Sequence, residues 1–98
     1  MDAKPYKETP HFVKWREGLR DQEALGRVMK RIVRLCCGLA GDNRFLGGGV
    51  SEMRIDYGPG YRVYYTEKDR KIIILLVGGD KRTQSADIEL AKKLATMI

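Results

Sequence analysis

The clearest structural signal in the sequence is a pair of alternating segments, residues 50–57 and 61–67, on either side of Gly58-Pro59-Gly60. In each segment apolar and polar side chains follow one another with a period of two, which is typical of a strand with one buried face. Glycine and proline favour a tight turn between such strands. The middle of the chain is therefore predicted to contain an antiparallel hairpin.

Three further segments complete the predicted sheet region. Residues 71–77 follow the charged connection 68–70 and contain the uninterrupted apolar run 72–77, which favours a central strand buried on both faces. Residues 4–8 are compatible with a short strand. The glycine-rich segment 41–49 is predicted to be a flexible connector.

Helices are indicated before and after the sheet. Thr9 and Pro10 are a typical N-cap and first helical residue, Asp21 caps a second helix, and a last helix follows Thr83 or Ser85. The second helix has an apolar stripe with helical spacing, which comprises Leu25, Val28, Met29, Ile32, Leu35, Cys36 and Leu39. The expected fold is α+β, with a helical hairpin and a C-terminal helix packed on one face of an antiparallel sheet of three to four strands.

The length of 98 residues fits a single domain spanning 1–98, and the net charge of +6 favours an anionic partner such as nucleic acid or an acidic protein. The longest apolar run is far too short to cross a membrane, so we expect a cytoplasmic protein with no membrane partner. Cys36 and Cys37 are adjacent and are predicted to be reduced packing residues. One histidine and two cysteines give no metal-ligand spacing, so neither a metal nor a cofactor is expected.

The polar face of the hairpin is the first candidate site. Pairing Tyr57 with Tyr61 would place Asp56 opposite Arg62, and Arg54 opposite Tyr64, with all four side chains facing away from the helices. Guanidinium groups bind phosphate oxygens through two parallel hydrogen bonds, which favours a phosphate-binding surface. The alternative interpretation is a solvated cross-strand ion pair.

Two other groups extend this basic character. The second helix presents a stripe opposite its apolar face, which comprises Arg27, Lys30, Arg31 and Arg34. The segment after the last strand adds Lys81, Arg82 and Gln84 beside two glycines, without the spacing of a nucleotide-binding loop. A solvated helix face and a plain turn are the respective alternatives to phosphate binding.

The segments VSEMRIDYGPGYRVYY (residues 50–65) and GGDKRTQ (residues 78–84) resemble the addiction-module killer branch (HigB/RelE-like) of the RelE/ParE toxin superfamily. The resemblance implies a type II toxin–antitoxin toxin held by a cognate antitoxin protein. It further implies a ribosome-dependent endoribonuclease that cuts mRNA through the RNA's own 2′-OH. A ParE-like inhibitor of DNA gyrase, or a basic module that binds RNA or antitoxin without catalysis, is the alternative.

The resemblance also implies roles for individual residues. Arg54, Arg62 and, after the last strand, Lys81 or Arg82 match the cations that stabilise the scissile phosphate. Asp56 stands where relatives carry a lysine, and the last helix lacks the usual tyrosine, so Asp56 as base and Tyr64 as acid or stacking residue are hypotheses. RNA or phosphate binding is expected from the remaining polar groups, namely Arg82, Gln84, Arg27, Lys30, Arg31 and Arg34.

Overall fold

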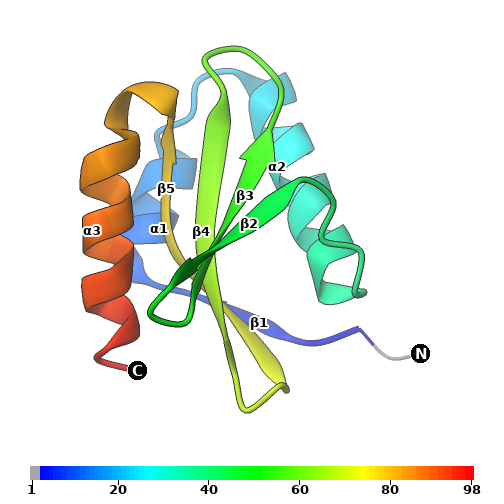
Figure 1. Ribbon diagram of the computed structural model, residues 1–98. Helices are drawn as coiled ribbons and strands as arrows, with labels where there is room; N and C mark the ends of the chain where they lie inside the picture. The colour runs from blue at the N-terminus through cyan, green and yellow to red at the C-terminus, as the bar shows by residue number, and fades with distance from the viewer. Residues whose placement is uncertain (1–2) are drawn as a thin grey trace.

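The structure is a computed structural model that describes residues 3–98 (Figure 1). Over these residues the helices are α1 (Pro10–Glu17), α2 (Gln22–Cys36) and α3 (Gln84–Ala95). The strands are β1 (Tyr6–Glu8), β2 (Asn43–Gly47), β3 (Val50–Ile55), β4 (Tyr61–Lys68) and β5 (Ile72–Asp80), and a short 3-10 helix, η1 (Lys81–Thr83), joins β5 to α3.

All strands belong to one sheet with the order β1-β5-β4-β3-β2. β1 is parallel to β5 and the other neighbours are antiparallel, so the predicted α+β class is confirmed. The sheet has one strand more than expected because β2 lies in the segment 41–49, which was wrongly predicted to be a flexible connector. Gly47, Gly48 and Gly49 all have positive φ (87°, 61° and 78°), and this tight glycine turn allows β2 to pair with β3.

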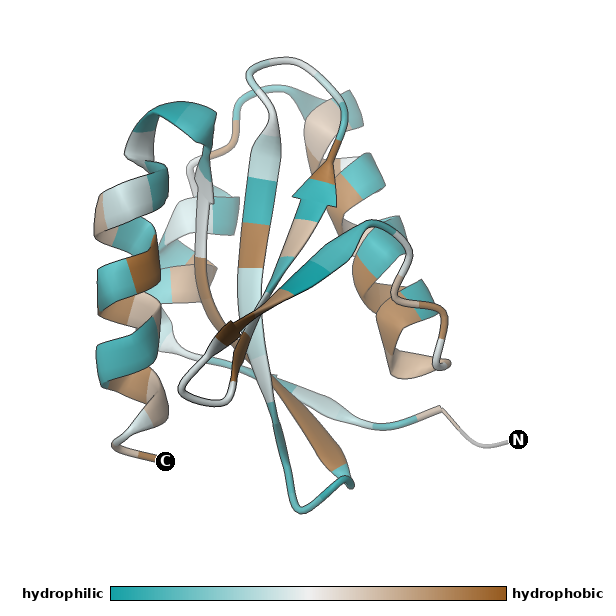
Figure 2. Cartoon of the chain, in the orientation of Figure 1, coloured by the Kyte–Doolittle hydropathy of each residue, from teal (hydrophilic) through white to brown (hydrophobic). Residues whose placement is uncertain are grey.

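The prediction that all helices cover one face of the sheet is wrong. α1 and α2 pack on one face, in a core that includes Phe12 and Ile32, while α3 covers the other face through Ala91 (Figure 1). The physical reason lies in β4 and β5, which carry large apolar side chains on both sides, and a sheet with two apolar faces needs two covering layers. In Figure 2, hydrophobic colour accordingly marks the inward side of α2 and much of β5.

The predicted helix starts are confirmed. The Thr9 side chain accepts a hydrogen bond from the backbone N–H of Phe12 at 3.2 Å, and Asp21 caps α2 through the backbone N–H groups of residues 23 and 24. The end of α2 comes earlier than the apolar stripe suggested, because Gly38 has a φ of 85° and Leu39 is exposed. Both cysteines are free, but only the first, Cys36, is a packing residue.

Gly78 and Gly79 lie inside β5 and permit close approach from both sides of the sheet. A Cβ atom on Gly78 would lie 2.0 Å from the indole ring of Trp15 in α1. On the opposite face, a Cβ atom on Gly79 would lie 1.9 Å from a carboxylate oxygen of Asp87 in α3. These glycines therefore serve the packing of both helical layers at the end of β5.

Candidate functional site

The β3–β4 hairpin has a longer turn than the sequence suggested. The observed pairs are Ile55 with Tyr61 and Arg54 with Arg62, so the predicted register, with Tyr57 opposite Tyr61, is wrong by two residues. Tyr57 leaves the sheet because its hydroxyl donates to Asp21 at the start of α2 at 2.8 Å. Because the shift is by two residues, every side chain stays on its predicted face of the sheet. The polar face is therefore as predicted, but its residues pair with different residues on the neighbouring strand.

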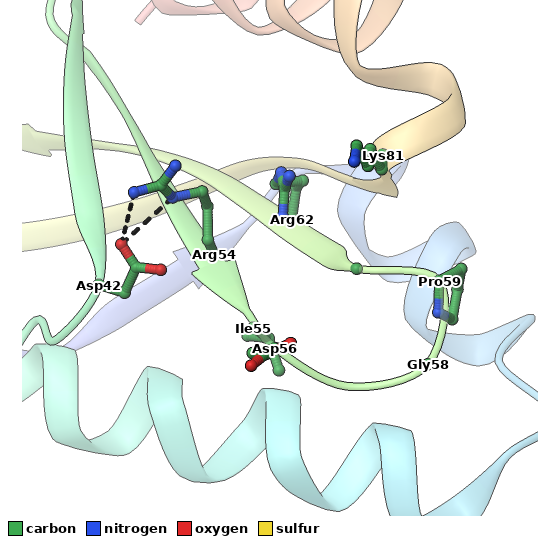
Figure 3. Close-up of a pocket in the computed structure, with 9 residues that line it drawn as sticks. Asp42, Arg54, Ile55, Asp56, Gly58, Pro59, Arg62 and Lys81 are labelled. Atoms are coloured by element: carbon green, nitrogen blue, oxygen red, sulfur yellow. Dashed lines mark hydrogen bonds and ion pairs between the residues drawn. The ribbon is translucent and has the colours of Figure 1, made fainter.

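An open pocket of about 480 Å³ lies at the end of the sheet where this turn meets the end of β5 (Figure 3). Its cations come from three separate segments: Arg54 from β3, Arg62 from β4 and Lys81 from η1. The remaining lining residues are Asp42, Ile55, Asp56, Gly58, Pro59 and Gly60. The structure thus brings together the three cations that the sequence singled out.

Arg54 is held at the rim of the pocket by a carboxylate that sequence analysis missed. Its Nε and a terminal nitrogen donate to Asp42 Oδ1 at 3.2 and 2.7 Å (Figure 3). These hydrogen bonds raise the pKa of the Arg54 guanidinium. The backbone N–H of Arg54 also donates to the Asp42 carbonyl, so the two residues are fixed at two points. Asp42 precedes β2, and the sequence gives no local signal that this loop returns to Arg54.

Arg62 is the most enclosed of the pocket cations, with a side chain only 13% exposed. Its Nε is buried and has no hydrogen-bond partner within residues 3–98, although Glu52 Oε2 lies 3.9 Å away. Glu52 is itself completely buried, and sequence analysis missed it because its position on a polar face suggested solvent. Gln84 donates to the same carboxylate at 2.8 Å, so its side-chain amide is engaged within the protein, and phosphate binding by Gln84 stays a prediction.

The side chains of Lys81 and Arg82, although adjacent in the sequence, have different surroundings. Lys81 lines the pocket and makes no ion pair with any of the residues described. A Cβ atom on Gly60 would lie 3.6 Å from both Lys81 Cβ and a terminal nitrogen of Arg62, so the Lys81 side chain begins beside the same glycine that the Arg62 guanidinium contacts. Arg82 turns away to Asp80 at 2.9 Å and lowers the pKa of that carboxyl group.

The prediction that Tyr64 faces the site is wrong. Its side chain is completely buried under α3, because the face on which it lies is covered by that helix. Burial, and then the nearby Glu52 carboxylate, raise the pKa of the phenol. Tyr64 does not line the pocket, whereas Asp56, on the turn, does.

The basic stripe of α2 divides into structural and exposed members. Arg31 is half-buried and donates to the carbonyls of residues 54, 40 and 42 at 2.7, 3.0 and 3.2 Å, so its guanidinium is engaged within the fold, and its role in RNA binding stays a prediction. Arg27 pairs with Glu23 and lies 4.5 Å above the Tyr57 ring. Lys30 and Arg34 are exposed and line, with Arg27, a second groove that shares the lining residues Ile55 and Asp56 with the pocket.

The described part of the chain shows neither a metal-binding cluster nor a membrane-spanning helix. Among residues 3–98, no cluster of three or more histidine, cysteine, aspartate or glutamate side chains is arranged to hold a metal ion. No helix in the same residues has the length and apolar character needed to span a bilayer.

A five-stranded sheet with α1 and α2 on one face, α3 on the other and a cationic pocket at its end defines the RelE-like fold. The chain is similar to the E. coli toxin RelE, solved in the free state with two arginines replaced by alanine, with a TM-score of 0.76. The match covers 95% of this chain and 99% of that structure at 17% identity. The fold expected from the two sequence motifs is confirmed.

Comparison of the sequence identifies the family to which the chain belongs. Residues 17–96 match the family described as "Phage derived protein Gp49-like (DUF891)", and the chain belongs to this family. It is also 44% identical over 89 residues to an uncharacterized protein of Haemophilus influenzae, a match that covers 91% of this chain and 90% of the relative.

Proposed function

We propose that this protein is the toxin of a type II toxin–antitoxin system and acts as a ribosome-dependent mRNA endoribonuclease. The observation that carries the proposal is the pocket in which Arg54, Arg62 and Lys81 converge from three segments of the chain. Converging cations stabilise negative charge that develops during phosphoryl transfer, and this electrostatic stabilisation is commonly the largest contribution to catalysis.

The reaction needs no nucleophile from the protein. The RNA 2′-oxygen bonds to the adjacent phosphorus while the bond from phosphorus to the 5′-oxygen breaks, which leaves a 2′,3′-cyclic phosphate and a 5′-hydroxyl. Asp56 lies in the pocket and is assigned the proton of the attacking 2′-OH, while solvent protonates the leaving oxygen. The cations hold the extra charge of the pentacoordinate phosphorane.

Dependence on the ribosome follows from what the pocket lacks. A carboxylate such as that of Asp56 is a weak base towards a ribose hydroxyl group. Tyr64, the other acid–base hypothesis, is buried away from the pocket. The barrier must then be lowered by orientation of the 2′-OH in line with the leaving group, which contributes several kcal/mol when the reactants are held rigidly. The ribosome is the component that holds the mRNA in that geometry.

The exposed cations outside the pocket are assigned to binding. Lys30 and Arg34, with Arg27, border a groove that shares Ile55 and Asp56 with the pocket, and Arg82 is exposed on η1. We assign phosphate contacts to these residues. An acidic antitoxin that covers the same cations fits the net charge of +6.

The test compares purified protein on a defined mRNA with and without programmed ribosomes. We expect cleavage only with ribosomes, and fragments that end in a 2′,3′-cyclic or 3′-phosphate. Lys81→Ala should abolish cleavage without loss of stability, because the Lys81 side chain is exposed. Lys68→Ala, an equally exposed lysine at the far end of β4, is the matched control and should cleave normally.

Two outcomes would contradict the proposal. Equal cutting of naked and translated mRNA would contradict ribosome dependence. No cutting in either case, together with inhibition of DNA supercoiling by purified gyrase, would replace the endoribonuclease with the gyrase-directed alternative.

A further inference from the structure

Among residues 3–98, Glu52 is the one charged residue whose side chain is buried. A carboxylate removed from water is strongly destabilising unless donors surround it. A buried carboxylate in the sheet of such a small domain therefore requires partners that compensate its charge. Its partners come from three different elements, β2, β4 and α3.

The two carboxylate oxygens of Glu52 have different partners. Oε1 accepts a hydrogen bond of 3.4 Å from Arg44, which belongs to the edge strand β2 and is half exposed. Oε2 accepts a hydrogen bond of 2.8 Å from Gln84, the first residue of α3, and lies 3.9 Å from Nε of Arg62. The oxygen nearest to Arg62 is thus fixed by the start of α3.

Arg62 is arranged to depend on this carboxylate. Its Nε is buried without a hydrogen-bond partner among residues 3–98, and Glu52 is the acidic group with which it pairs there. The terminal nitrogens lie at the pocket, one of them beside Gly60 (Figure 3). A guanidinium is planar and rigid, so the electrostatic attraction of a carboxylate 3.9 Å from Nε favours one direction of the terminal nitrogens.

We propose that Glu52 is a positioning residue that holds Arg62 in the pocket and makes its orientation depend on the seating of α3 through Gln84. The effect on cleavage rests on the proposed function. The placement of Arg62 does not, because it is a property of the free protein.

The first experiment measures the placement directly by NMR. In the wild-type protein the Arg62 Nε–H proton should exchange slowly with solvent, because it is buried. In Glu52→Gln, which keeps the side-chain shape and removes the charge, we expect exchange to accelerate at least tenfold. Glu67→Gln makes the same chemical change at the exposed ion pair with Lys4 and should leave the Arg62 signal unchanged.

A second variant covers the case in which Glu52→Gln does not fold. Gln84→Ala keeps a good helix former at the start of α3 and removes the donor to Glu52 Oε2. It should accelerate Arg62 Nε–H exchange in the same direction, by a smaller factor, while the amide protons of the core strand β5 stay protected. Unchanged Arg62 exchange in the folded variants would overturn the proposal, whatever their activity.

The second experiment separates positioning from a purely structural role. On programmed ribosomes, Glu52→Gln should lower kcat on the order of 10²-fold, the effect of displacing a charge-stabilising group by about 1 Å, and leave KM unchanged because exposed cations bind the ribosome. Glu67→Gln should change neither constant. Faster Arg62 exchange with an unchanged kcat would overturn the role in cleavage. Absence of cleavage by the wild type would refute the proposed function, and NMR would still decide the placement.

Discussion

Replacement of Arg62 by alanine tests how far the stability of the fold depends on a residue of the site. From sequence, the side chain faces away from the apolar layer, which predicts a fully folded variant that lacks only activity. In the structure the side chain is 13% exposed and lies 3.9 Å from a carboxylate with no exposure at all. Truncation at Cβ removes the nearest cation from Glu52 Oε2 and leaves that charge buried.

The magnitude follows from the partners that remain. Removal of one partner of a buried ion pair typically costs about 3–5 kcal/mol. Here Glu52 retains Gln84 at 2.8 Å and Arg44 at 3.4 Å, and the lost contact at 3.9 Å is too long for a hydrogen bond. We therefore expect Arg62→Ala to lower the free energy of unfolding by about 2 kcal/mol, below the typical range. A domain of this size would then lose about 8–16 °C in Tm.

The assay is urea denaturation followed through the fluorescence of Trp15, the single tryptophan, which packs against the core. Arg54→Ala is the control: its ion pair with Asp42 is at the surface, so the loss should stay below about 1 kcal/mol. A double-mutant cycle with Glu52→Gln should show a coupling energy of about 1 kcal/mol. In the Glu52→Gln background, replacement of Arg62 by alanine leaves no buried carboxylate unpaired and should therefore cost less than in the wild type. Equal stability of the Arg62 and Arg54 variants, or strict additivity in the cycle, would refute this reasoning.

Three further outcomes are expected. Tyr64→Phe should retain ribosome-dependent cleavage, because Tyr64 is buried away from the pocket. Burial raises the pKa of Tyr64 in the folded protein, so its contribution to stability is complete below the unfolded pKa of about 10 and is lost as the pH rises above that value. The free energy of unfolding, measured by urea denaturation, should therefore fall less in alkali for the variant than for the wild type. Gly78→Ala should cost about 1–3 kcal/mol by denaturation and shift Trp15 fluorescence, because its Cβ would lie 2.0 Å from the indole. Removal of the exposed cations Lys30 and Arg34 together should raise KM for programmed ribosomes with kcat unchanged and flatten the dependence of KM on salt.

Sequence patterns predicted the elements whose causes are local. The helix starts at Thr9 and Asp21 depend on side chains that bond to the backbone two or three residues ahead, so the relevant atoms are neighbours in the sequence. The hairpin strands were equally visible because alternation is a property of each strand alone. The hairpin register was not, since it depends on the hydrogen bond from Tyr57 to the N-cap of α2, 36 residues away.

The residues of the candidate site likewise fall into those that the sequence predicted and those that it did not. Its cations could be predicted because they follow from motifs on the strands and after β5. Their carboxylate partners could not: Asp42 reaches Arg54 from another strand connection, and Glu52 appears polar and exposed until α3 is known to cover its face. An alternating strand shows which residues share a face, but only the packing of a distant helix determines whether that face meets water.

The glycine pair in β5 connects the packing of the sheet to the position of the site. Gly78 and Gly79 admit Trp15 and Asp87 to opposite faces of the strand, so both helical layers close on the sheet just before it ends. Asp80 then caps η1 by accepting from the backbone of Arg82 at 2.8 Å, and this turn carries the next residue, Lys81, to the pocket beside Arg62. Because helices cover both faces, the open end of the sheet is where converging cations remain accessible to a polyanion. The glycines of this segment therefore act through packing: they determine where the chain turns, and the turn places Lys81 at the pocket.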